Sequence, residues 1–501
     1  MTEFARFGDP ARFEVAVRWT RDAEARARRP ARHGWSMGDL ALTVGGAIVT
    51  RSRRGAATQS HVGWYLAPFF EWLASNWAPL LHEEAFAWPE KSDTVAVIAC
   101  NRALDRWIAT TDVDGRTRYR DIQAWYRRHA VRQAAEGGLF PDLFVRRLAD
   151  DIELSWSTAP PFCAPHGFQF VVEPGHARLA VAEVGGPLWE ALQWTASQPP
   201  PTLHESDRAE WRALCEKVEA IPNLTDFQLD SAFVAPEILV EVRKALDRAG
   251  KPELAVEAVE RTHPFVETFS PAVAMFGGVS PGLTSADVDA LCRRLVKADG
   301  GEDSESLKKL ISEGGAPIGV PYEEGYGLAE GFLADLNLPG FSNWVDIRDV
   351  AGRLGIEVDE ISLDTGAIRG VAFAGEGFQS TILVNQRSVF NANENGKRFT
   401  IAHELCHILI DRSRARRVAH ISGHWVAPGV ERRANAFAAY VLMPRELVLR
   451  HFSGHGREPE AIIELAAALR VNETALIEHL YNIDLIDEVR REELRDHFRR
   501  H

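Results

Sequence analysis

The stretch of sequence that decides the fold runs from Lys397 to Pro444: KRFTIAHELCHILIDRSRARRVAHISGHWVAPGVERRANAFAAYVLMP. Residues 403–407 form an H-E-x-x-H motif. On a helix, His403 and His407 lie one turn apart and project from the same face. Two imidazoles at this spacing can hold one metal ion, and Glu404 between them is placed to take a proton from a water on that metal.

The residues around the motif predict a helix. Between Phe399 and Leu409 there is no proline or glycine, and apolar residues recur at helical spacing. Turn residues precede this segment, so we expect Thr400 or Asn395 to cap the helix, and the polar run after Asp411 to end it. Cys406 points about 100° away from each neighbouring histidine and is expected in the core.

A following helix is expected to supply a third ligand, because catalytic zinc sites usually have three protein ligands and a water. Residues 431–440 predict this helix, after a break at Pro428-Gly429. Its small and apolar stripe would pack closely against the first helix, and the stripe consists of Ala434, Phe437 and Ala438. Glu431, one turn before the stripe, would face the metal, and Asn435 lies on the same face as a candidate for orienting a ligand.

The segments RFTIAHELCHILID and ERRANAFAAYVLMP resemble the ImmA/IrrE family of metallo-endopeptidases, in which H-E-x-x-H is followed by E-x-x-A-N-x-F-A and Met-Pro. The resemblance runs from about Pro321 to the C-terminus. It includes WVDIRDVAGRLGIEV, similar to the family's opening helix, the strand at 382–385, and closing helices at 462–486. Two positions depart from the family pattern: Cys406 stands where a small residue is common, and Asp411 stands where histidine is common.

The resemblance implies a zincin-like domain that binds Zn²⁺ through His403, His407 and Glu431. It also implies that Glu404 is the catalytic residue of peptide-bond hydrolysis, as general base and then general acid. Candidates for stabilising the oxyanion are His420, His424 and Tyr440. The strand at 381–385, or its partner, is expected to bind an extended substrate segment through main-chain hydrogen bonds.

The resemblance further implies that the substrate is a regulatory protein, commonly a helix-turn-helix repressor, in a stress, mobile-element or defence response. One alternative is a toxin or defence effector protease controlled by a partner antitoxin. Another is a non-catalytic binding module that zinc only stabilises. The intact Glu404 argues against the last, because a structural zinc site does not need it.

The length of 501 residues allows two or three domains. We expect an α+β multidomain protein with an aromatic-rich α+β domain at 1–200, a helical middle region at 201–315 and the peptidase domain at 321–501. All but two of the 14 tryptophans precede residue 212, which sets the first domain apart from the peptidase. This domain is expected to bind a ligand or protein that triggers the enzyme.

Several elements of the N-terminal region are predicted from local pattern. A helix is expected over 1–37, a hairpin over 39–51 around Gly45-Gly46, and an aromatic helix that opens at Pro68. Further on, the sequence predicts a buried strand, a helix and a second hairpin around Pro174-Gly175; these lie at 94–100, at 119–135, and at 168–172 with 178–184.

Composition limits the class of protein. A net charge of −14 argues against direct nucleic-acid binding, which needs a local excess of cations. The five cysteines are scattered and lack C-x-x-C spacing, which is typical of a reducing compartment. No secretory signal and no apolar run of membrane-spanning length is evident, so a cytoplasmic protein without membrane contact is expected.

Overall fold

The computed structural model describes most of the chain, and the residues discussed below lie within it. These residues are 3–21, 33–84, 95–134, 139–148, 151–161, 164–256, 261–277, 283–311, 320–336, 343–411, 417–421, 428–452 and 458–500. The chain divides into two compact units: Met1–Ala235 with Glu257–Phe269, and Pro236–Val256 with Ser270–His501. Among the described residues, no helix is long and apolar enough to cross a membrane.

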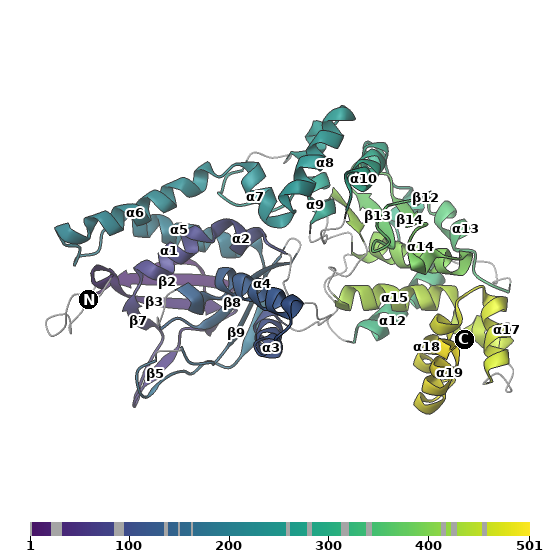
Figure 1. Cartoon of the computed structure of the whole chain (residues 1–501), viewed down its shortest axis with the longest axis horizontal. Coiled ribbons are helices and arrows are strands. Elements are labelled where there is room, and N and C mark those ends of the chain that lie inside the picture. Colours follow the sequence, from purple (N-terminus) through teal and green to yellow (C-terminus); the bar gives the residue numbers. More distant parts are fainter. Residues whose placement is uncertain are drawn as a thin grey trace. The chain divides into compact units, whose positions relative to one another are not determined.

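The first unit combines antiparallel sheets with helices (Figure 1). Its five-stranded sheet contains β1 (Ala5–Asp9), β2 (Phe13–Trp19), β3 (Met37–Val44), β4 (Ala47–Ile48) and β7 (Val62–Tyr65). Two three-stranded sheets follow, in the orders β10 (Phe168–Phe170), β5 (Ser52–Arg54), β6 (Ala57–Gln59), and β11 (Gly175–Ala180), β9 (Asp151–Ser157), β8 (Asp142–Leu148). The helices are α1 (Ala67–Ser75), α2 (Trp77–His82), α3 (Ala96–Trp107), α4 (Val113–His129), α5 (Val181–Ser197), α6 (Arg208–Ala220) and α7 (Asp226–Phe233).

The helix expected over residues 1–37 is wrong where the structure describes this segment. Residues 5–9 and 13–19 form the antiparallel pair β1 and β2. In β2, Phe13, Val15, Val17 and Trp19 alternate with other residues, which is the period of a strand. This alternation outweighs the abundance of alanine and arginine; residues 22–32, where arginine is densest, lie outside the described part of the chain.

The strand expected at 94–100 is also wrong, because α3 begins at Ala96. A short apolar run does not distinguish a strand from a buried helix by its periodicity alone. Long-range contacts decide here: Glu153 accepts a hydrogen bond from the Ala96 amide at 2.8 Å, and Ser155 accepts one from the Val97 amide at 3.1 Å. Side chains of β9 thus satisfy amides that the start of a helix leaves without intrahelical partners.

The two predicted hairpins have opposite outcomes. The one at 39–51 is confirmed, since β3 and β4 pair on either side of Gly45-Gly46, both of which have positive φ. The one around Pro174-Gly175 is wrong: β10 pairs with β5, β11 pairs with β9, and Val181 already starts α5. The predicted aromatic helix is present as α1 and α2, and much of the tryptophan is core material, including Trp77 and Trp125.

The second unit contains a mixed sheet in the order β12 (Glu357–Ile361), β14 (Thr381–Asn385), β13 (Gly370–Gly375), β15 (Arg417–Ile421). Its helices up to the sheet are α8 (Pro236–Arg248), α9 (Pro271–Phe276), α10 (Ser285–Ala298), α11 (Glu305–Lys308), α12 (Pro321–Asp335) and α13 (Ile347–Arg353). The remaining helices are α14 (Glu394–Ile410), α15 (Pro428–Leu442), α16 (Arg445–His451), α17 (Pro459–Leu469), α18 (Glu473–Asn482) and α19 (Glu488–Arg500).

The predicted strand at 381–385 is present as β14, and β13 pairs with it on the other side of residues 375–377. However, β14 lies between β12, which is parallel to it, and β13, which is antiparallel. β13 in turn pairs with β15 on its other side. Neither β14 nor β13 therefore has an open edge, and a substrate segment cannot add to them. Among the strands that the structure describes, β12 is the partner of β14 that lies at an edge of the sheet.

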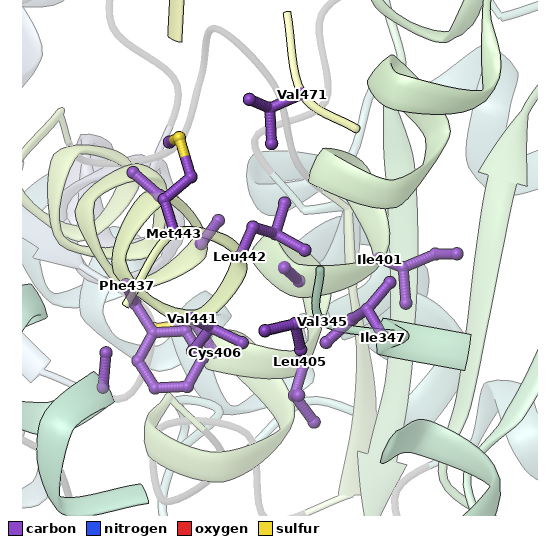
Figure 2. Packing of buried hydrophobic residues seen from close by; sticks show 14 of the residues in the cluster. Val345, Ile347, Ile401, Leu405, Cys406, Phe437, Val441, Leu442, Met443 and Val471 are labelled. Carbon is purple, nitrogen blue, oxygen red and sulfur yellow. The ribbon is translucent and has the colours of Figure 1, made fainter. Parts of the chain in front are cut away.

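The core of this unit forms where α14 and α15 pack together. Figure 2 shows Leu405 and Cys406 of α14 beside Phe437 and Val441 of α15, and all four belong to one buried cluster. Cys406 is fully buried, and burial raises the pKa of its thiol well above the ordinary value. Its predicted place in the core is confirmed.

Candidate metal centre

Helix α14 carries the two histidines and begins at a polar cap. Asn393, rather than Thr400 or Asn395, caps it: its side-chain oxygen accepts a hydrogen bond from the Gly396 amide at 2.8 Å. Gly396 is required here, because a Cβ at this position would collide with the carbonyl oxygen of Phe390. The first turn of α14 therefore packs directly on the preceding backbone, which fixes where the motif starts.

His403, His407 and Glu431 converge. Nε2 of His403 lies 3.1 Å from Nε2 of His407, and these nitrogens lie 3.4 and 3.6 Å from the carboxylate oxygens of Glu431. A tetrahedral ion with bonds of about 2.1 Å would hold its ligand atoms about 3.4 Å apart. The structure thus brings together two imidazoles from α14 and a carboxylate from the first turn of α15 as a group that could hold a metal ion.

The other nitrogen of each imidazole faces an acceptor. Nδ1 of His403 lies 3.1 Å from Oδ1 of Asn435, an oxygen that also accepts a hydrogen bond from Arg369. Nδ1 of His407 lies 2.7 Å from the carboxylate of Asp411. With Nδ1 as the donor of each ring, the neutral tautomer turns both Nε2 lone pairs toward each other and toward Glu431. A cation between them relieves this repulsion, so the residues fit a metal ion.

Asp411 has a second partner, Arg433 of α15, which donates to its other oxygen. Arg433 is fully buried and also donates to Glu324 of α12, at 2.7 Å. Burial lowers the pKa of the Arg433 guanidinium, but the carboxylates Asp411 and Glu324 raise it above the ordinary value. A charged chain thus runs from α12 to His407 and holds this imidazole in place.

Reasoning from the sequence did not predict this series of contacts from Glu324 through Arg433 and Asp411 to His407. Asp411 follows His407 by four residues on the same helix, so helical spacing alone could have indicated their contact. No local pattern relates Glu324 to Arg433, because they are separated by 109 positions.

Glu404 is fully buried beside the start of β13. A Cβ on Gly370 would lie 2.5 Å from Oε1 of Glu404 and 2.8 Å from Cγ2 of Thr400, so only glycine leaves room for this carboxylate. Arg369, the preceding residue, donates to Thr400 at 3.1 Å and to Asn435 at 3.3 Å. Burial lowers the pKa of Arg369, while the nearby carboxylates Glu404 and Glu431 oppose this shift.

A network of asparagines fixes the backbone of Arg369. Asn385, at the end of β14, donates to the carbonyl oxygens of Thr365 and Ile368, both at 2.8 Å. Asn391 donates to the carbonyl oxygens of Arg369 and Asn385, at 2.8 and 2.7 Å. The loop before β13 is thereby held against α14, which brings Arg369 and Gly370 to the centre.

The three residues expected as candidates for stabilising the oxyanion are not grouped in one element. His420 lies in β15 with its Cα opposite that of Ala372, and His424 lies outside the described residues. Tyr440 is nine residues beyond Glu431 on α15, which is about 13 Å along the axis. Its ring contacts Tyr326 and His479, with centroid distances of 5.3 and 6.1 Å.

Comparison with known proteins gave a family match within the second unit. No match was found among curated proteins. Residues 351–496 match the peptidase family M78, described as the IrrE N-terminal-like domain. The match contains both histidines, Glu404 and Glu431. The C-terminal part of the chain is therefore an IrrE N-terminal-like domain of peptidase family M78.

Proposed function

We propose that the centre binds Zn²⁺ and that the protein is a metallo-endopeptidase, which hydrolyses peptide bonds in a regulatory protein. The observation that carries this proposal is the convergence of His403, His407 and Glu431, with each imidazole held from behind by an acceptor. Two imidazoles and a carboxylate are the ligand set of catalytic zinc in several hydrolases.

The buried carboxylate of Glu404 supports catalysis in addition to binding. Zn²⁺, when bound, supplies a Lewis acid that polarises the scissile carbonyl and lowers the pKa of a water toward about 7. Glu404 takes the proton of this water as the oxygen adds to the carbonyl carbon. It then delivers the proton to the nitrogen as the C–N bond breaks, so the products are a carboxylate and an amine.

The alternative of a zinc-stabilised binding module is less well supported. A site that only stabilises the fold needs no buried acid next to its ligands, whereas here Gly370 leaves space for the carboxylate of Glu404. The choice of a regulatory protein as substrate, such as a helix-turn-helix repressor, rests on the family resemblance. We infer that the aromatic-rich first unit receives the signal that controls cleavage.

Three variants test the proposal. Metal analysis of the purified chain is expected to find zinc in the wild type and in Glu404→Gln, and less in His403→Ala. In cells, newly formed protein N-termini that depend on the wild type are expected to vanish with Glu404→Gln but to persist with Glu446→Gln, a change of an exposed glutamate on α16. If the same new N-termini form with Glu404→Gln, the proposed hydrolysis is wrong.

A further inference from the structure

A groove with a volume of about 850 Å³ opens beside the metal centre. It shares Arg369 and Asn435 with the centre, and it follows α15 from Arg432 past Ala436 to Ala439. This volume is within the range of pockets that enclose a ligand. The groove therefore adjoins the place where the scissile bond must lie.

Large apolar side chains are exposed on the walls of the groove. Val389 and Phe390, just before α14, are 80% and 58% exposed, and Tyr322 at the start of α12 is 42% exposed. Exposed apolar groups gathered around a hollow are typical of a binding surface. Ala436 and Ala439 of α15 also line the groove, and their small side chains leave room for a bulky one.

Arg369 lies at the end of the groove next to the centre. Thr400 and Asn435 accept hydrogen bonds from Arg369, and its guanidinium lies 5.4 and 5.0 Å from the ring centroids of Phe390 and Phe399. These contacts orient the guanidinium plane while Arg369 still lines the groove. A guanidinium carries five N–H donors, so it can hold Thr400 and Asn435 and also donate to a backbone carbonyl.

Acidic side chains also line the groove. Glu473 and Glu478 of α18 are among the lining residues, and Glu478 also pairs with Arg495 at 3.3 Å. The groove therefore favours a ligand that presents a carbonyl near Arg369, a bulky apolar side chain at the middle and a positive charge near Glu473. A polypeptide can present all three groups. It must be extended at this point, because carbonyl groups within a helix are already hydrogen-bonded.

We propose that this groove binds an extended segment of the protein substrate. A bulky apolar side chain of this segment packs against Phe390, Ala436 and Ala439. Arg369 donates to a backbone carbonyl of the segment, and a lysine or arginine of the segment meets Glu473. This inference rests on the proposed function, since it assigns to the peptidase a preference for apolar and basic residues near the cleaved bond.

The test uses the full chain, loaded with zinc and carrying Glu404→Gln so that the probe stays intact. The probes are fluorescein-labelled peptides Lys-Gly-Ser-Ala-X-Ala-Ser-Gly-Lys, with X as phenylalanine, glycine or aspartate, and fluorescence anisotropy measures their affinity. The phenylalanine peptide is expected to bind about tenfold more tightly than the other two. Exchange of both lysines for glutamate is expected to weaken its binding.

Surface variants locate the binding. Val389→Ser and Phe390→Ser are expected to remove the preference for phenylalanine, whereas Val489→Ser on α19, where the side chain is 69% exposed, is the matched control and should keep it. Arg369→Gln is expected to lower the affinity for all three peptides by a similar factor. Zinc content, measured on each variant, shows that the centre is intact.

Two results would overturn the inference: equal affinity for the three peptides, or a preference for phenylalanine that survives in both groove variants. Neither depends on cleavage. If the peptides bind as expected but the wild type cleaves none of them, the groove stands and the proposed hydrolysis is in question. If the wild type cleaves them without regard to X, the hydrolysis stands and the groove assignment fails.

Discussion

Arg433 and Asp411 form a buried ion pair next to the imidazole of His407, one of the three candidate metal ligands. Glu324 of α12 completes the arrangement by pairing with the other side of the Arg433 guanidinium. The family match begins at residue 351, so Glu324 precedes it. The centre of this protein is therefore supported by a helix that lies outside the segment matched to the family.

Asp411→Asn tests this support. The amide cannot supply a carboxylate to both Nδ1 of His407 and the charged Arg433, so the imidazole loses its fixed orientation. Groups that orient a ligand in this way typically contribute about 10–100-fold to metal affinity. Competition with a chromophoric zinc chelator should show a loss of this size. Asp349→Asn, which alters an exposed acid on α13, is the control, and equal affinities in the two variants would contradict the assigned role.

Substitution of glycines in α12 tests how closely this helix must pack against α15. A Cβ on Gly325 would collide with the carbonyl oxygen of Arg433 and approach the Cβ of Ala436 at 2.8 Å, so α12 and α15 must separate in Gly325→Ala. Overpacking of this kind costs about 1–3 kcal/mol. Gly331→Ala on the same helix meets nothing within 4 Å and should stabilise the helix by about 0.5–1 kcal/mol. Urea unfolding of both variants measures the difference, and equal shifts would show that the close approach is unimportant.

The parts of the centre that sequence predicted are those set by helical geometry. His403 and His407 share a face because they are four residues apart, and Asn435 follows Glu431 by the same interval. Asp411 stands at the same spacing from His407, yet its effect depends on Arg433, which only the packing of α15 against α14 brings near. Arg369 and Gly370 reach the centre because Asn385 and Asn391 hold their loop, and no local pattern encodes that contact.

Two of the wrong predictions in the first unit, the strand at 94–100 and the hairpin around Pro174-Gly175, have a similar cause. The apolar run that starts α3 suits a strand or a helix equally well, and Glu153 and Ser155 of a later strand decide by accepting the free amides of its first turn. Similarly, β11 finds its partner in β9 rather than in the nearer β10. Local pattern gave the period of β3 and α14 correctly, and it failed where distant partners choose between two periods.

Gly370→Ala is expected to separate catalysis from metal binding. The added methyl group would occupy the space of the Glu404 carboxylate, whose Oε1 would lie 2.5 Å away, while the ligands His403 and His407 are not displaced by it directly. A shift of about 1 Å in a reacting group can cost about 10²-fold in rate. The measurement is cleavage of a substrate identified by its new N-terminus, with zinc content determined in parallel. Gly352→Ala on α13, where a methyl group meets nothing within 4 Å, is the control. Full activity in Gly370→Ala would show that Glu404 need not stay where it is.

The buried His479 makes the second unit sensitive to acid. Its Nε2 donates to the carbonyl oxygen of Met443 at 2.8 Å, and its Nδ1 accepts from the hydroxyl of Tyr326 at 2.8 Å. Burial lowers the pKa of His479 from 6.5 to about 4, although the bond to Met443 opposes this shift. In the unfolded chain, His479 therefore binds a proton below about pH 6.5. In the native state it binds this proton only below about pH 4.

The stability of the unit must then fall as the pH drops through this window, by up to about 3 kcal/mol from this one group, at 1.36 kcal/mol per pKa unit. His479→Gln is expected to be less stable at pH 7, because it loses the bond from Tyr326, but to lose less stability between pH 6.5 and pH 4. Hydrogen exchange of amides in α12 and α18, corrected for the intrinsic effect of pH, measures this. His451→Gln, at a partly exposed histidine of α16, is the control. If protection falls equally with pH in both variants, His479 is not the group that makes the unit acid-sensitive.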